Sequence, residues 1–152
     1  GRILILGAGG AAMAVAQGCI ELGREDIYVL SRRPEQADRI ANVLGSQVKS
    51  GRLAIGEVPL DSCGVLINCL PPTAIPIFES LRFHSMAATS LIYDLNYGGR
   101  DLILSSAAGR ADLRFVDGLD MLVWQGIRAF QLWTGRQPDY DLVFRELALA
   151  TA

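Results

Sequence analysis

Residues 3–12, ILILGAGGAA, decide the fold of this 152-residue chain. The first four residues form a continuous apolar run, which is typical of a parallel strand that is buried on both faces. Gly7, Gly9 and Ala12 then fit the pattern GxGxxA. From Ala12 to Ile20 apolar residues recur at helical spacing, and Gly23 follows where a helix would end. A strand, a glycine turn and an amphipathic helix in this order predict the opening unit of a nucleotide-binding fold.

Short apolar runs alternate with helical patterns along the rest of the chain. This alternation predicts an α/β, doubly wound (Rossmann-type), mostly parallel six-stranded sheet with helices on both faces. Right-handed crossovers give the strand order 3-2-1-4-5-6. After the first strand, strands are expected at 27–30, 53–55, 65–67, 90–93 and 114–116, and helices at 34–44, 74–81, 101–108, 119–133 and 139–149.

Composition and charge exclude several classes of protein. The formal net charge is −2 and Lys49 is the single lysine, so the chain lacks the basic clusters of a nucleic-acid-binding protein. No apolar run reaches the roughly 20 residues that span a bilayer, so no membrane partner is expected. Three cysteines without ligand spacing predict buried, reduced thiols, no metal site and a cytoplasmic location. Without a starting methionine, residues 1–152 are expected to be one domain of a longer protein.

The glycine turn has the chemistry of an anion site. Gly7 permits a tight turn, Gly9 lets the backbone approach a pyrophosphate, and Ala12 keeps the helix close to the strand. The free N–H groups and the positive end of the helix dipole favour a negatively charged group there. A purely structural glycine turn is the less favoured alternative.

The end of the second strand points to the identity of the dinucleotide. An NAD site usually has an acidic residue there, which binds the ribose hydroxyls. This chain has Ser31, Arg32 and Arg33 instead. A guanidinium pairs well with a 2′-phosphate, which a carboxylate would repel. The sequence therefore predicts NADP as the cofactor, and two solvated arginines at a strand end are the alternative.

The helix expected at 119–133 carries two lines of side chains. Gly118, Met121 and Gln125 follow one line that starts at the carboxyl ends of the strands, and the amide of Gln125 can bind a hydroxyl or carboxylate of a small substrate. From spacing alone, an ordinary helix surface is the more favoured interpretation of this line. The second line is expected to pack in the interior and comprises Leu119, Leu122, Val123, Phe130 and Trp133. Trp124 is also expected to pack rather than to stack on a ligand.

Three blocks resemble the NADP-binding domain of the shikimate dehydrogenase family over essentially the whole chain. They are residues 7–12 (GAGGAA), residues 31–33 (family pattern Asn-Arg-Thr) and residues 118–138 (GLDMLVWQGIRAFQLWTGRQP; family pattern GLxMLxxQ, then Phe and Trp-Thr-Gly). The resemblance implies an NADP-dependent dehydrogenase that reduces 3-dehydroshikimate to shikimate, a precursor of aromatic amino acids. It also implies that the helix at 139–149 returns toward an N-terminal substrate domain of the same protein.

The resemblance gives each site residue a role. Ser31 and Arg32 would hold the adenosine phosphate, Tyr97 and the Gly118 backbone would flank the nicotinamide with Met121 near the ring, and Gln125 would reach the substrate. The expected cofactor-binding residues are Gly7, Ala8, Gly9, Gly10, Ala11, Ala12, Ser31, Arg32, Arg33, Cys69, Leu70, Pro71, Tyr97, Gly118 and Met121. No residue of this chain is expected to be catalytic.

Two blocks differ from the family pattern, and both are expected beside the nicotinamide. Residues 68–74 read NCLPPTA where the family has Asn-Ala-Thr-Pro-x-Gly-Met, and residues 97–101 read YGGRD where it has Tyr-x-Pro-x-x-Thr. The Lys–Asp pair of the family's substrate domain is absent, and Lys49 is in the wrong place to replace it. We therefore expect the chain to bind the cofactor without catalysing the reaction.

Two alternatives remain open at this stage. The altered blocks would suit a non-catalytic module that senses a cofactor or metabolite within a regulator. Equally, the protein could be a quinate/shikimate-type or amino-ketone oxidoreductase with another substrate. His84 is expected to be a solvated or locally bonded loop residue. Asp94 and Asp117 are expected to hydrogen-bond backbone or ribose, with helix capping as an equal alternative.

Overall fold

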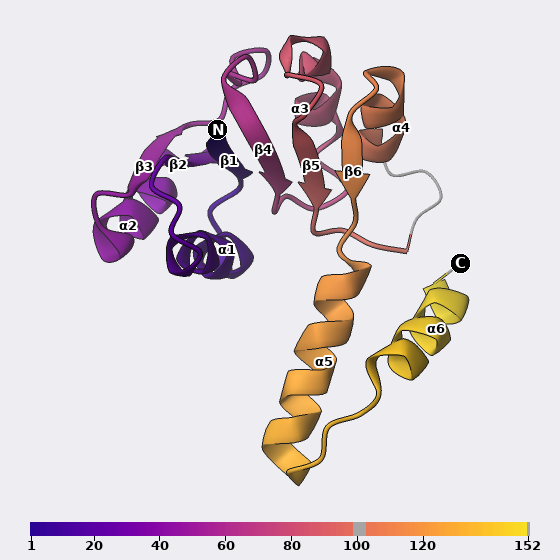
Figure 1. The fold of residues 1–152 in the computed structure, drawn as a ribbon. Coiled ribbons are helices and arrows are strands. Elements are labelled where there is room, and N and C mark those ends of the chain that lie inside the picture. Colours follow the sequence, from indigo (N-terminus) through magenta and orange to yellow (C-terminus); the bar gives the residue numbers. More distant parts are fainter. Residues whose placement is uncertain (99–102, 152) are drawn as a thin grey trace.

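The computed structural model describes residues 1–98 and 103–151, and its centre is a six-stranded sheet (Figure 1). The strands are β1 (Arg2–Leu6), β2 (Ile27–Ser31), β3 (Val48–Arg52), β4 (Cys63–Asn68), β5 (Leu91–Asp94) and β6 (Arg114–Val116). They lie in the order β3-β2-β1-β4-β5-β6, and every neighbouring pair is parallel. The predicted fold class and strand order are confirmed.

Helices cover both faces of this sheet, and the last two extend beyond it. They are α1 (Gly10–Glu21), α2 (Pro34–Leu44), α3 (Ile75–Ser80), the short 3-10 helix η1 (Phe83–Ser85), α4 (Ile103–Arg110), α5 (Leu119–Thr134) and α6 (Tyr140–Thr151). In Figure 1, α1 and α2 lie on one face, α3 and α4 lie on the other, and α5 leaves the sheet at the carboxyl end of β6. Within the described residues, no helix has both the length and the apolar character to cross a membrane.

The core is divided by the sheet into two clusters of buried side chains. Leu4 and Leu6 of β1 belong to the cluster that α3 and α4 cover, whereas Ile3 and Ile5 belong to the one that α1 and α2 cover. Successive side chains of a strand point to opposite faces, so the apolar run of β1 fills both clusters at once. The central strand is thereby fixed, and with it the glycine turn that follows.

The third strand differs from its prediction. It was expected at 53–55, but β3 occupies Val48–Arg52 and pairs with β2 along its whole length. β3 is at the edge of the sheet, where it pairs with β2 alone and is less buried than a central strand. The polar sequence VKSGR is compatible with this position. Leu53 follows the strand as a buried loop residue whose N–H donates to the Ser31 carbonyl at 2.8 Å. Arg52, not Ile55, therefore ends this strand.

The packing line expected along α5 is correct only in its first half. Val123 is fully buried, but Phe130 is 43% exposed and Trp133 is 82% exposed. The reason is the direction of α5, which runs away from the sheet and contacts α6 instead (Figure 1). The ring of Trp124 stacks on that of Tyr140 with 5.0 Å between centroids, although Trp124 is still half exposed.

Candidate functional site

The residues that follow β1, β2, β4 and β5 meet along one side of the sheet, which we call the carboxyl edge. Gly7 lies against the backbone of Cys69, the Leu70 carbonyl accepts a hydrogen bond from the Asn96 side chain, and the Asn96 carbonyl in turn accepts the N–H of Gly118. Parallel strands bring their carboxyl ends to one edge, so four loops far apart in the sequence become neighbours. Most of the site residues expected from the sequence lie in or beside these loops.

The glycine turn leaves space above the start of α1. Gly7 has φ +105°, and a Cβ atom on it would approach the Cys69 carbonyl oxygen to 3.2 Å, so this position requires glycine. Cβ atoms built on Gly9 and Gly10 would meet nothing within 4 Å. No side chain caps α1, and its first turn carries no acidic residue. The open space and the uncapped N–H groups fit a phosphate group.

The end of β2 is basic and accessible. Ser31 is buried and its hydroxyl oxygen accepts the N–H of Arg33 at 3.2 Å, which fixes the turn into α2. Arg32 and Arg33 are exposed. Arg32 contributes to a cavity of about 600 Å³ between the ends of β2 and β3 and the β4–α3 loop, and Leu70 and Pro71 line the opposite wall. A second hollow of about 310 Å³ adjoins Gly9 and Gly10.

A buried polar cluster holds the β4–α3 loop in place. Asp94 is 2% exposed, and its Oδ1 atom accepts hydrogen bonds from the Asn68 side chain at 2.7 Å and from the Asn96 backbone and side chain at 3.0 and 2.8 Å. The Leu70 N–H donates to Asn68 Oδ1 at 3.0 Å. A carboxylate that accepts several hydrogen bonds is well satisfied in the interior. Asp94 therefore positions the loop, and its contact with the Asn96 N–H is the backbone hydrogen bond that the sequence offered as one of its possible roles.

The start of α5 is locked to the β5 loop by Gly118. A Cβ atom at this position would overlap the Leu95 carbonyl oxygen, and the Gly118 N–H donates to the Asn96 carbonyl at 3.0 Å. Asp117 accepts the Leu119 N–H at 3.1 Å, so the capping alternative is confirmed for this residue. Further along α5, Met121 is half-buried and Gln125 is exposed, and both lie on the turns of the helix nearest the carboxyl edge.

Two expected residues beside the nicotinamide have contrasting surroundings. Cys69 is half-buried, and burial, with Asp94 and Cys19 nearby, raises the pKa of its thiol to about 12. The thiol is therefore protonated at neutral pH and is a poor nucleophile. Tyr97 is 43% exposed at the end of the β5 loop. Residues 99–101 of the altered YGGRD block lie outside the described residues.

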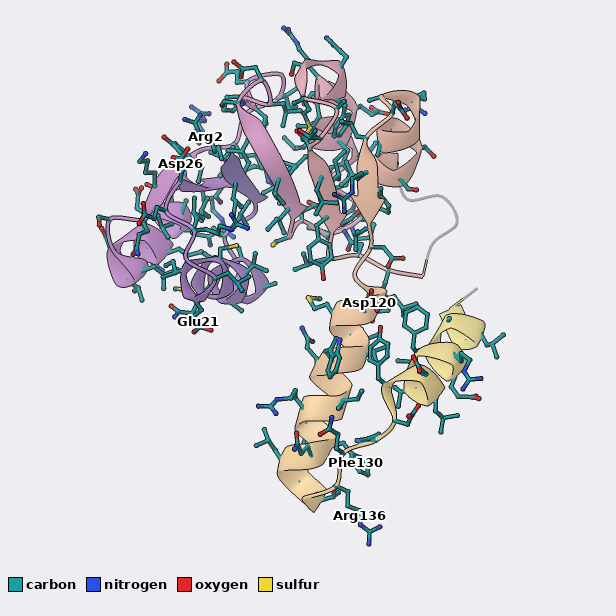
Figure 2. All side chains as sticks on the ribbon, in the orientation of Figure 1. Arg2, Glu21, Asp26, Asp120, Phe130 and Arg136 are labelled. Carbon is teal, nitrogen blue, oxygen red and sulfur yellow. The ribbon has the colours of Figure 1, made fainter. Side chains whose placement is uncertain are left out.

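Two residues set aside in the sequence reasoning lie away from the carboxyl edge. Lys49 is near the amino end of β3, where its ammonium contacts Asp26 at 3.2 Å, and Arg2 pairs with the same carboxylate at 3.2 Å. Figure 2 shows Arg2 and Asp26 side by side there. His84 is exposed in η1, as expected of a solvated loop residue. Lys49 therefore cannot serve chemistry at the carboxyl edge.

Sequence reasoning missed three residues at this edge. Arg52 lines the same cavity as Arg32, but the third strand was expected after it, so its place at a strand end was not recognised. Asn68 and Asn96 complete the polar cluster around Asp94. A polar residue directly at the end of a buried run was the available signal for Asn68, and the spacing of two residues from Asp94 was the available signal for Asn96.

Two family models match separate parts of the chain. The model described as "Shikimate 5'-dehydrogenase C-terminal domain" matches residues 118–146, which contain α5 and the start of α6. The model described as "NADP oxidoreductase coenzyme F420-dependent" matches residues 2–92, from β1 into β5. The second match covers the glycine turn, the basic end of β2 and all the residues that line the cavity of about 600 Å³.

Whole-chain comparisons point in the same direction. The chain is 34% identical to shikimate dehydrogenase (NADP(+)) of Methanothermobacter thermautotrophicus over 93% of its own length and 52% of that protein. It superposes with a TM-score of 0.75 on shikimate 5-dehydrogenase from Thermus thermophilus in complex with NADP(H) and shikimate, at 32% identity, over 99% of this chain and 55% of that one. The ligand-free 5-ketofructose reductase of Gluconobacter sp. strain CHM43 gives a TM-score of 0.80 at 26% identity, over 98% and 56%.

The chain thus spans about half the length of the curated relatives that it matches. Within that half, the matches extend from the first strand to the last helix and include the block 118–146 that the sequence resemblance emphasised. Residues 2–92, more than half of the chain, place it in the NADP oxidoreductase family that the second model describes, and over its whole length the chain is similar to shikimate dehydrogenases.

Proposed function

We propose that this chain binds NADP(H) along its carboxyl edge and is the cofactor domain of an oxidoreductase that interconverts 3-dehydroshikimate and shikimate. The observation that carries the proposal is the alignment of two features on one edge. An uncapped helix start with open space above Gly9 and Gly10 is joined, through Leu70, to a cavity that carries Arg32. A dinucleotide with an extra phosphate needs both an anion site and a separate cation.

In this proposal each group of residues has one task. The N–H groups at the start of α1 bind the pyrophosphate, and Arg32, with Ser31 and Arg33 beside it, binds the phosphate of the adenosine ribose. Tyr97, Gly118 and the other residues expected near the nicotinamide orient the ring. The bound cofactor supplies the hydride, and the protein supplies position and charge.

The reaction also needs an acid–base group, because a proton accompanies the hydride transfer. Lys49 cannot supply it, since it lies at the opposite edge of the sheet. We propose that an N-terminal substrate domain of the same protein supplies that group, that Gln125 contacts the substrate from this side, and that the chain alone binds without turnover. A cytoplasmic location belongs to the same proposal, supported by three free cysteines.

Calorimetric titration of the chain with NADPH and with NADH tests the cofactor assignment. NADPH should bind more tightly, and Arg32→Ala should weaken NADPH by about tenfold or more, since a charge-assisted hydrogen bond is lost, while NADH binding stays unchanged. Arg24→Ala is the matched control, because Arg24 is exposed in the turn before β2, at the other edge. Equal affinities of the unchanged chain for the two dinucleotides would contradict the proposal.

A second candidate keeps the cofactor and changes the substrate. It is favoured by the likeness to 5-ketofructose reductase and by the Leu70-Pro71-Pro72 sequence of the β4–α3 loop, which differs from the family pattern. A panel of hydroxy and keto substrates offered to the full-length protein separates the two candidates. Preference for shikimate supports the first, and preference for another polyol supports the second. The regulator alternative requires that the full-length protein turn over no member of the panel.

A further inference from the structure

The cavity at the ends of β2 and β3 carries two arginines, one from each strand. Arg32 follows β2 and Arg52 ends β3, and both line the same space of about 600 Å³. That volume is within the range of small-molecule sites. The other lining residues form a mostly apolar wall: Leu53, Ala54, Ile55, Leu70, Pro71, Thr73, Ala74, Pro76 and Ile77.

The register between β2 and β3 brings the backbones of Arg32 and Arg52 close together. Arg52 pairs with Ser31, the residue just before Arg32, and the next N–H along β3, that of Leu53, donates to the Ser31 carbonyl at 2.8 Å. Neighbouring strands are about 4.8 Å apart, so the side chains of Arg32 and Arg52 start from adjacent backbone positions. Each is long enough to reach a group held between them.

The positive charges of Arg32 and Arg52 are not paired with acidic side chains of the described residues. Within residues 1–98 and 103–151, neither Arg32 nor Arg52 has a side-chain hydrogen bond or an ion pair, and both are exposed. Two like charges at adjacent positions repel each other, and a doubly negative group placed between them converts that repulsion into two attractions. An apolar wall opposite two guanidinium groups suits a purine ring that carries a phosphate nearby.

We infer that Arg52 is a second arginine for the 2′-phosphate of NADP, acting with Arg32 from the neighbouring strand. This inference rests on the proposed function, because it assumes that the dinucleotide occupies the carboxyl edge. It assigns to an edge strand of polar sequence a direct part in the choice between NADP and NAD. Arg52 thereby becomes a specificity-determining residue, whereas the pyrophosphate site determines only that a dinucleotide binds.

The test compares two small probes that differ only in the phosphate concerned, adenosine 2′,5′-bisphosphate and adenosine 5′-monophosphate. Calorimetry on the chain should show that Arg52→Ala weakens the bisphosphate about tenfold, as expected for one lost charge-assisted contact. Binding of the monophosphate should not change. Arg52→Lys should recover only part of the loss, because an ammonium keeps the charge without the two-pronged geometry. The double variant, Arg32→Ala with Arg52→Ala, should bind both probes equally.

Controls make the outcomes distinct. Arg24→Ala removes the same charge at the other edge of the sheet and should leave both probes unaffected. If Arg52→Ala leaves the affinity for the bisphosphate unchanged, as Arg24→Ala should, while Arg32→Ala still weakens it, this inference fails and the proposed function stands. Equal loss of both probes in Arg52→Ala would assign the residue to the adenine and overturn the inference. If the unchanged chain does not prefer the bisphosphate, the proposed function fails and the inference fails with it.

Discussion

At the scale of single residues, Gly118 shows how a backbone contact can decide which amino acid a position accepts. Its amide joins the start of α5 to the β5 loop, and there is no room for a side chain between it and Leu95. The same residue begins the block that matches the shikimate dehydrogenase model. Gly118 is therefore a structural requirement of this domain, in addition to any contact that it makes with a cofactor.

Gly118→Ala should destabilise the chain by roughly 2 kcal/mol or more, because the new methyl group forces the α5 start away from Leu95. Urea unfolding followed by circular dichroism measures this change. Gly126→Ala is the matched control: it lies inside α5 with nothing within 4 Å of a built Cβ, and should stabilise the helix by up to about 1 kcal/mol. Equal free energies of unfolding of the two variants would show that the Leu95 backbone can move to accommodate a methyl group at position 118.

The buried thiols predict a dependence of stability on alkaline pH. Burial raises the pKa of Cys69 from 9.0 to about 12 and that of Cys63 to about 11, so the folded chain holds these protons more tightly than the unfolded chain. This contribution to stability is complete below pH 9 and is lost as the pH rises toward 11 or 12. Urea unfolding at about pH 8 and about pH 10.5 should show the decrease, and Cys69→Ala should reduce it. A decrease of the same size in Cys69→Ala would contradict the assignment to this thiol.

At the scale of elements, a feature could be predicted from the sequence when the residues that determine it are close together in the chain. The glycine turn of residues 7–12 is local, because strand, turn and helix follow one another, and the sequence alone predicts it. The position of β3 depends on its pairing with β2, and no apolar pattern within VKSGR indicates that register. Arg52 was missed for this reason, and the contact of Asn96 with the Leu70 carbonyl was missed because Leu70 lies 26 residues earlier in the chain.

The contact between α5 and α6 predicts a raised pKa for the phenol of Tyr140. Tyr140 donates to the Asp120 carboxylate and stacks between Trp124 and Phe144, and the hydrogen bond to Asp120 raises the pKa of Tyr140 to about 12. Figure 2 shows Asp120 at the start of α5. Burial also raises the pKa of Tyr93, so absorbance titration of the phenolate band should show late ionisation of both tyrosines, and Asp120→Asn should return Tyr140 toward its ordinary range. If the titration of Asp120→Asn matches that of the unchanged chain, this hydrogen bond does not cause the shift.

At the scale of the whole molecule, α5 and α6 form an arm that extends beyond the sheet (Figure 1). The arm exposes large apolar side chains, among them Leu132 and Trp133, each 82% exposed, and Leu149 at 77%. Exposed apolar side chains of this size are often part of an interface. Because the chain spans about half of its relatives, the arm is a suitable surface for the proposed substrate domain, and the sequence of this chain alone cannot distinguish such a surface from a core.

Trp133 and Val123 lie on the same helix, α5, but differ in exposure, so substitutions at the two positions should change the free energy of unfolding by different amounts. Trp133→Ser should change the free energy of unfolding of this chain by less than about 0.5 kcal/mol, because the side chain is in solvent. Val123→Ala should cost roughly 2 kcal/mol, because Val123 is fully buried. Chemical unfolding of both variants checks the difference, and in the full-length protein Trp133→Ser should become the more harmful of the two. A large cost of Trp133→Ser in this chain alone would place Trp133 in a core.

The single lysine of the chain, Lys49, lies at the edge of the sheet opposite the glycine turn, where it pairs with Asp26. A reagent that attacks side-chain amines therefore has one attachment point, and that point faces away from Arg32 and Arg52. Coupling through it would tether every copy to a sensor chip in the same orientation, with the nucleotide pocket turned outward to the flowing solution.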